Sequence, residues 1–237
     1  MYQESLIGFE WLGPSHLAAL GFLFIMVILI WLLKDKISVR LDGWIRKTLA
    51  VFLVFLEFNF YFWMLVIQRR PFDVSMLPLG LCAMSLYLTA LMLWTKNIRL
   101  LKIILPWALS GALISIVIVN MAYDFPHFRY VHYFGNHIGF MLGNLYMVVI
   151  HRVAYSYKDL LKSSKILFII ALIMYPINFL IDANHLFLRE LPEGTDTLYG
   201  YLGSFWVLGF AFSIFLLFHL WYIPIQRLSK WRQPMIE

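Results

Sequence analysis

The chain has 237 residues, of which 62% are hydrophobic and 14% are charged, whereas soluble domains are about 45–50% apolar. This composition excludes an ordinary soluble domain and indicates an integral membrane protein. The net charge of +6 comes from basic residues in short segments between apolar runs. That distribution is typical of membrane topology, so we expect no binding to nucleic acid.

Seven apolar runs are long enough to cross about 30 Å of hydrocarbon as α-helices. They cover residues 15–33, 45–67, 74–94, 101–120, 131–153, 165–182 and 199–223. No polar block between them is large enough for a second folded unit. The predicted fold class is therefore all-α, a polytopic membrane protein whose seven transmembrane helices form a single domain over residues 1–237. The oligomeric state is left open.

Basic residues are distributed unevenly between the two sets of connections. Fifteen of the 19 Lys and Arg residues follow the first, third, fifth and seventh runs, and the others are Arg69, Arg70, Arg129 and Arg189. Cytoplasmic connections carry the excess of positive charge in membrane proteins. We therefore predict that the N-terminus lies outside and the C-terminus inside.

The first two runs each contain one polar group of interest. His16 opens the first run beside Pro14 and Ser15, where we favour a capping or interfacial role over a ligand role. Glu57 lies near the middle of the second run, where a charged carboxylate costs about 2.5–3.5 kcal/mol on insertion scales. We expect Glu57 to be protonated or paired. A bond to an Asn, Tyr or His of another helix is preferred over a proton-relay role.

The third and fifth runs bring together a thiol and an imidazole. The only cysteine, Cys82, lies eight residues into the third run and His137 lies six residues into the fifth, so both are expected at similar depth in the outer half of the bilayer. A histidine within hydrogen-bond reach activates a thiol as a nucleophile. The alternatives are an inert packed cysteine and a histidine that bonds across helices.

The fifth run also carries His132, Asn136 and Asn144, and polar groups inside a span indicate a functional site by default. Small residues spaced four apart predict a helix side that packs closely against a neighbour, as at Gly135, Gly139 and Gly143.

Further polar residues are predicted at the outer end of the bundle. Asn178 and Asp182, one turn apart in the sixth run, could orient His137 or a lipid headgroup. Arg69 and Arg129 suit a phosphate headgroup, although ordinary snorkelling explains them equally well.

His and Asp residues in the same part of the chain are candidate metal ligands. The candidate ligands are His127, His132, His137 and Asp182, but their spacing matches no known metal pattern. We therefore expect neither a metal nor a cofactor.

Three segments resemble the YwaF-like family of bacterial integral membrane proteins: PFDVSMLPLGLC, DFPHFRYVHYFGNH and PINFLIDANHLFLRELP. That family is similar to eukaryotic transmembrane acyltransferases that remodel ether phospholipids with a Cys and His pair, and more remotely to androgen-induced lipid hydrolases that use Thr and His. The resemblance implies that Cys82 is the nucleophile and His137 the base, that membrane lipids are the partners, and that the protein lies in a bacterial plasma membrane. Gly80 and Ala83 stand where the bacterial and eukaryotic patterns, respectively, carry a histidine.

Two functional hypotheses follow. The preferred one is a lipid acyltransferase or lipid hydrolase that passes an acyl chain through a thioester on Cys82. The alternative is a proton-linked transporter or membrane sensor, in which Glu57, His137 and Asp182 line a path and Cys82 only packs.

Overall fold

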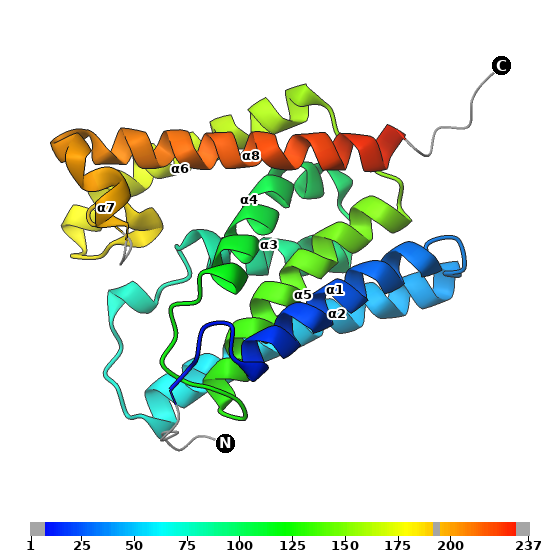
Figure 1. Ribbon diagram of the computed structural model, residues 1–237, viewed down its shortest axis with the longest axis horizontal. Helices are drawn as coiled ribbons and strands as arrows, with labels where there is room; N and C mark the ends of the chain where they lie inside the picture. Colours follow the sequence, from blue (N-terminus) through cyan, green and yellow to red (C-terminus); the bar gives the residue numbers. More distant parts are fainter. Residues whose placement is uncertain (1–7, 192–194, 231–237) are drawn as a thin grey trace.

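The computed structural model describes residues 8–191 and 195–230, and within these ranges all regular structure is helical (Figure 1). Seven helices have 15 residues or more: α1 (Pro14–Leu33), α2 (Val39–Phe62), α3 (Leu81–Thr95), α4 (Ile98–Val117), α5 (Phe128–Ile150), α6 (Tyr157–Leu180) and α8 (Trp206–Lys230). The shorter elements are a π-helical turn at Trp63–Ile67, 3-10 turns at Val74–Met76, His185–Phe187 and Gly200–Phe205, and α7 (Asp196–Tyr199). The predicted all-α class is confirmed.

The helix α5 lies at the centre of the packing. It contacts α1, α2, α3, α4 and α8, whereas α6 packs against α4 and α8. Figure 1 shows α6 and α8 along the upper edge of the molecule and α1 and α2 along the lower edge. The buried core is accordingly formed mainly by α4 and α5.

The connections gather at two opposite ends of the bundle (Figure 1). At one end, Arg46 near the start of α2 donates to the carbonyl oxygen of Leu93 near the end of α3 at 2.6 Å. At the other end, the Trp11 indole before α1 donates to the carbonyl oxygen of Val117 at the end of α4 at 2.8 Å. Connections that alternate between the two ends are what a chain with seven spans requires. The number of spans and their orientation remain predictions.

Five segments of the described residues are long and apolar enough to cross a membrane: Pro14–Leu33, Val39–Ile67, Ile98–Val117, Tyr157–Leu180 and Gly200–Leu228. The helix α3 has 15 residues, about 22 Å at 1.5 Å per residue, which is less than the hydrocarbon thickness of about 30 Å. The helix α5 has 23 residues and carries the polar groups described below. The chain is therefore a multi-pass membrane protein by the composition of its helices.

The predicted start of the third span at residue 74 is wrong, because α3 begins at Leu81. The Asp73 carboxylate accepts a bond from Ser75 N and caps the short turn Val74–Met76 instead. Leu77 is extended, with φ −59° and ψ 141°, as is usual for a residue before proline. Hydropathy alone does not distinguish this apolar but non-helical segment from the helix that follows.

Three other predicted helix starts differ for local reasons. The second helix begins at Val39 rather than 45, because the Ser38 hydroxyl accepts a hydrogen bond from Leu41 N and caps the helix. The sixth helix begins at Tyr157 rather than 165, because Ser156 and Asp159 form a capping box ahead of the apolar run. The last helix begins at Trp206 rather than 199, because the chain is broken at Gly203, with φ 50° and ψ −130°.

Candidate active site

The glycine side of α5 faces α2. A Cβ atom at Gly135 would lie 2.7 Å from Leu56 Cδ1, and one at Gly139 would lie 2.8 Å from Leu53 Cδ2. Real Cβ atoms do not come this close, so the glycines permit the contact, and the predicted close packing is confirmed. This contact leaves the side of α5 that carries Tyr133 free to reach α4.

Cys82 is the second residue of α3 and lies against α4. Its Sγ is 3.8 Å from the Ser115 hydroxyl oxygen, and a Cβ at Gly111 would lie 3.3 Å from the same sulfur. Among the described residues, no side chain caps this helix end at Gly80. The expected depth of eight residues is corrected, since Cys82 lies in the first turn.

His137 is held in a defined tautomer. Its Nδ1 lies 2.7 Å from the carbonyl oxygen of Tyr133, one turn earlier on α5. A carbonyl oxygen only accepts, so Nδ1 carries the proton and Nε2 keeps its lone pair. Nε2 has no hydrogen-bond partner within the described ranges. The side chain therefore presents a ring nitrogen with an unshared lone pair.

Ser115 and Tyr133 connect the two candidates. The Tyr133 hydroxyl donates to the carbonyl oxygen of Ser115 at 2.9 Å, and the Tyr133 ring lies 4.5 Å from the His137 ring between centroids. Cys82 and His137 thus each contact one member of this pair. No hydrogen bond joins Cys82 to His137 directly in the part of the chain that the structure describes.

Sequence reasoning did not identify this connecting pair. Tyr133 could have been found from its spacing, since it lies four residues before His137 on one helix. Ser115 gives no such signal, because it is one of two serines in an otherwise apolar run and nothing in the sequence distinguishes it from Ser110.

A buried polar tract continues below these residues between α3 and α5. Asn144 Nδ2 donates to the Thr89 hydroxyl at 2.7 Å and to the carbonyl oxygen of Phe140 at 2.8 Å. Asn144 Oδ1 and the hydroxyls of Ser85 and Ser110 are buried with no partner among the described residues. Buried polar atoms of this kind usually bind ordered water or a ligand. The tract makes the interior beside Cys82 polar.

Glu57 forms the centre of a second polar cluster. Its Oε2 accepts from His132 Nε2 and from Asn136 Nδ2, both at 2.9 Å, and the three side chains are buried. The contacts agree with the preferred structural interpretation of Glu57. The carboxylate is bound by two neighbouring turns of α5.

Arg129 extends this cluster toward the end of the bundle. Its NH1 lies 2.9 Å from His132 Nδ1, and because a guanidinium only donates, Nδ1 accepts and Nε2 carries the proton given to Glu57. The Arg129 guanidinium also lies 4.4 Å from the centroid of the Phe60 ring. A positive and a negative group are therefore joined through a neutral imidazole.

His16 joins α1 to α4. Its Nδ1 accepts from the backbone N–H of Leu12 at 3.0 Å, and its Nε2 donates to the carbonyl oxygen of Ile116 at 2.8 Å. Both ring nitrogens are thus used in a fully buried side chain. These contacts agree with the capping role.

Asn178 and Asp182 organise the loop after α6. Asn178 Oδ1 accepts from His185 N at 2.9 Å and its Nδ2 donates to His185 O at 2.8 Å, while Arg189 binds Asp182 at 2.7 Å. Neither residue makes a hydrogen bond to His137. Arg69 is exposed and has a positive φ of 50° beyond the π-helical turn.

The opposite end of the bundle contains a cluster that the sequence analysis missed. The buried Asp42 carboxylate accepts from Tyr146 at 2.9 Å, from His151 at 3.0 Å and from Arg46 at 3.1 Å. Lys96 lies 3.8 Å from the same carboxylate. Four segments of the chain are therefore joined through one acidic side chain.

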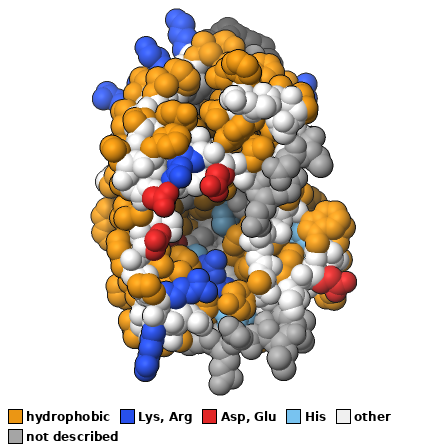
Figure 2. Space-filling model, turned by 90° about the vertical axis from the view of Figure 1, so that its left-hand side faces the viewer, with side chains coloured by type: hydrophobic (Ala, Val, Ile, Leu, Met, Phe, Trp, Pro, Cys, Tyr) orange, Lys and Arg blue, Asp and Glu red, His pale blue; other side chains and the backbone are white. Residues whose placement is uncertain are grey.

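Figure 2 shows the end of the molecule that carries the connections 68–80 and 118–127 and the described residues of the segments 181–191 and 195–205. The surface is hollowed near its centre, acidic and basic side chains flank the hollow, and histidine side chains are visible within it. Polar groups at this end of the bundle are therefore accessible from outside.

Among the described residues, no group of three or more His, Cys, Asp or Glu side chains is placed to hold a metal ion.

The fold defines a multi-pass helical membrane protein with polar groups enclosed among its helices. The model of the TMEM164 family matches residues 11–223, and the chain belongs to this family. No curated protein and no solved structure matches the chain. The resemblance to YwaF-like proteins and to acyltransferases remains a prediction.

Proposed function

We propose that the protein is a membrane-lipid acyltransferase or lipid hydrolase, with Cys82 as the nucleophile and His137 as the general base. The observation that carries the proposal is the free Nε2 of His137, beside the Ser115 and Tyr133 pair that also contacts Cys82. Membrane lipids are the partners, and the plasma membrane of a bacterium is the proposed location.

The proposed reaction has two halves, and each half transfers one acyl group and moves one proton through His137. Nε2 of His137 accepts the thiol proton, and the Cys82 sulfur attacks the ester carbonyl carbon of a lipid. A C–S bond forms, the ester C–O bond breaks, and His137 returns the proton to the leaving alcohol oxygen. In the second half, His137 takes a proton from the acceptor hydroxyl, whose oxygen attacks the thioester. The sulfur leaves and regains the proton.

The nature of the acceptor decides between the two named activities. A lipid hydroxyl gives acyl transfer, and water gives hydrolysis. Both activities require Cys82 Sγ and His137 Nε2 to approach to about 3 Å in the reacting complex.

The test is trapping of the thioester. Purified protein is incubated with phospholipid vesicles whose acyl chains are radiolabelled, and hydroxylamine-sensitive label on the protein is measured. Because Cys82 is the only cysteine, label lost in Cys82→Ala is assigned to that sulfur. His137→Gln should reduce the labelling rate by about 100-fold or more, the usual contribution of a general base.

His219→Gln is the matched control. His219 Nδ1 makes the same bond to a carbonyl one turn earlier, at Phe215 O and 2.8 Å, but lies on α8. Labelling should be unchanged in this variant. Wild-type protein that acquires no label, and neither transfers nor hydrolyses acyl chains, would contradict the proposal.

The transporter or sensor alternative is favoured by a different observation, the chain of contacts from Arg129 through His132 to Glu57. If this function holds, Glu57→Gln should abolish pH-driven flux in liposomes while Cys82→Ala leaves it intact. If Cys82→Ala abolishes acyl transfer while Glu57→Gln leaves it intact, the result supports the enzyme.

A further inference from the structure

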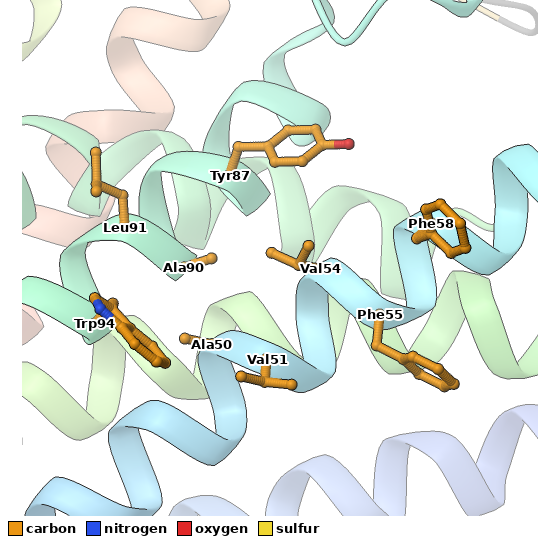
Figure 3. Close-up of a pocket in the computed structure, with 9 residues that line it drawn as sticks. All are labelled: Ala50, Val51, Val54, Phe55, Phe58, Tyr87, Ala90, Leu91 and Trp94. Atoms are coloured by element: carbon orange, nitrogen blue, oxygen red, sulfur yellow. The ribbon is translucent and has the colours of Figure 1, made fainter.

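A continuous groove runs along the lipid-facing surface between α2 and α3. Its apolar part has a volume of about 600 Å³ and is lined by Ala50, Val51, Val54, Phe55, Phe58, Tyr87, Ala90, Leu91 and Trp94. Figure 3 shows the α2 and α3 side chains on its two sides, with Trp94 at one end and Phe58 at the other. Cys82 contacts α4 instead, so the groove is separate from the candidate active site.

A second part of about 650 Å³ continues the groove toward the end of the bundle that carries Asp42. It shares Val51 and Trp94 with the apolar part and is also lined by Arg40, Gly43, Trp44, Lys47 and Thr48. A Cβ at Gly43 would meet no atom within 4 Å, so the floor is open there.

The lining residues follow helical spacing. Along α2 they recur at intervals of three and four residues from Arg40 to Phe58, and along α3 from Tyr87 to Trp94. One stripe of α2 is therefore basic at its start and apolar toward the middle of the helix. Lys47 and Phe58 are about 16 Å apart along the axis at 1.5 Å per residue, close to one leaflet of a hydrocarbon layer about 30 Å thick.

The two cations of the groove are not neutralised by the protein. Arg40 and Lys47 are exposed, and neither forms an ion pair with another described residue. The nearby carboxylates are engaged elsewhere, since Asp42 binds Arg46 and Asp35 binds Arg152. Lys47 Nζ lies 5.5 Å from the centroid of the Trp94 ring, at the junction of the two parts. The charge at this end of the groove is complementary to an anion.

We propose that this groove binds an anionic phospholipid from the leaflet at the Asp42 end, with the headgroup on Arg40 and Lys47 and an acyl chain along Val51 to Phe58. The Thr48 hydroxyl and the Trp44 indole supply neutral hydrogen-bond donors at the level of the headgroup. The site does not depend on acyl transfer, and its lipid is not a substrate of Cys82.

The test is lipid binding by native mass spectrometry of the full chain released from detergent. Phosphatidylglycerol and phosphatidylcholine of identical acyl chains are titrated in parallel. Wild type should bind one phosphatidylglycerol about 10- to 30-fold more tightly, from the attraction of two basic side chains near one negative charge. Equal affinities for the two lipids would overturn the proposal.

Variants separate the headgroup contact from general charge. Arg40→Gln with Lys47→Gln should bring the preference to within about two-fold. The matched control is Lys36→Gln with Arg99→Gln, which removes one Lys and one Arg from exposed positions outside the groove. A control variant that loses the preference to the same extent would refute the site.

The acyl contact needs a variant of its own. Val54 is 43% exposed, so the larger side chain of Val54→Trp enters the groove and not the core. This variant should bind phosphatidylglycerol and phosphatidylcholine roughly ten-fold or more weakly than wild type. Val27→Trp on α1, outside the groove, should have no effect. Glycerol phosphate, the soluble headgroup, should fail to compete. Competition by it would mean a phosphate site rather than a lipid site.

Discussion

His132 and His137 lie on the same helix but carry their protons on different ring nitrogens. His132 accepts from Arg129 through Nδ1 and donates to Glu57 through Nε2, so both of its nitrogens are used. His137 donates through Nδ1 to a backbone carbonyl and keeps Nε2 free. The two imidazoles therefore have separate roles. His132 holds a charge pair in place, and His137 is the one able to accept a proton.

Removal of the Glu57 carboxylate should destabilise the protein strongly. Glu57→Ala leaves the Nε2–H of His132 and the Nδ2–H of Asn136 without their acceptor, at a cost of about 3–5 kcal/mol in the free energy of unfolding. Glu57→Gln keeps an acceptor oxygen of the same size and should cost less. Thermal unfolding in detergent checks the order, and equal losses in the two variants would contradict it.

For individual residues, the sequence predicted which type of partner a buried side chain would have better than it predicted the particular residue that supplies it. A buried carboxylate requires a donor, so Glu57 could be expected to meet an Asn or His. The partners of Asp42 could not be read in the same way, because Tyr146 lies 104 residues away and is brought near only by packing of α5 on α2. The contact between Ser115 and Cys82 could not be predicted for the same reason.

Among the helices, α5 was predicted well and α3 poorly. The repeated glycines of α5 act through spacing alone, and spacing is preserved in the sequence. The start of α3 depends on Asp73 and Pro78, which hold an apolar segment out of the helix. Apolar composition therefore located the spans, while turn-forming residues decided where they begin.

Substitution of a glycine on α5 should separate its helix from α2. Gly139→Val places a side chain 2.8 Å from Leu53 Cδ2, a fully buried atom group, and should destabilise the protein by about 1–3 kcal/mol. Gly21→Val on α1 meets no atom within 4 Å and controls for the change in helix propensity. Similar melting temperatures for the two variants would show that the contact does not limit stability.

The loop after α6 should be loosened by a change at its anchor. Asn178→Ala removes both bonds to the His185 backbone, about 1–3 kcal/mol for a fully buried pair of contacts. Limited trypsin digestion should then cut after Arg189 roughly five-fold faster, because local opening of the loop exposes it. Asn59→Ala, which removes an exposed bond to Phe55 O, should leave the rate unchanged.

Over the whole molecule, polar contacts concentrate at the two ends and within α5. The Asp42 cluster joins α2, α5 and the segments after α3 and α5 at one end, and His16 joins α1 to α4 at the other. The helices between these ends are held mainly by apolar packing. Each end therefore determines which helices are neighbours.

The predicted orientation can be checked by labelling single cysteines introduced into Cys82→Ser. Ser75→Cys lies at the predicted outer end and Thr95→Cys at the inner end, and both positions are exposed. A membrane-impermeant thiol reagent added to intact cells should label the first and spare the second. The opposite result would reverse the topology drawn from the basic residues.

The contacts of α1 have a consequence for biogenesis. The carbonyl oxygen of Ser15 accepts a hydrogen bond from the Tyr130 hydroxyl, 115 residues later. The carbonyl oxygen bonded by His16, that of Ile116, is likewise synthesised only with α4. At translation rates of about 5–20 residues per second, Tyr130 is synthesised about 6–23 s after Ser15. The first span therefore completes its contacts only after α4 and α5 are made, and a ribosome-bound chain that ends before α5 should leave α1 free to cross-link to lipid or to an insertion chaperone. Order of synthesis and order of assembly are separated in this protein by the placement of one histidine and one tyrosine.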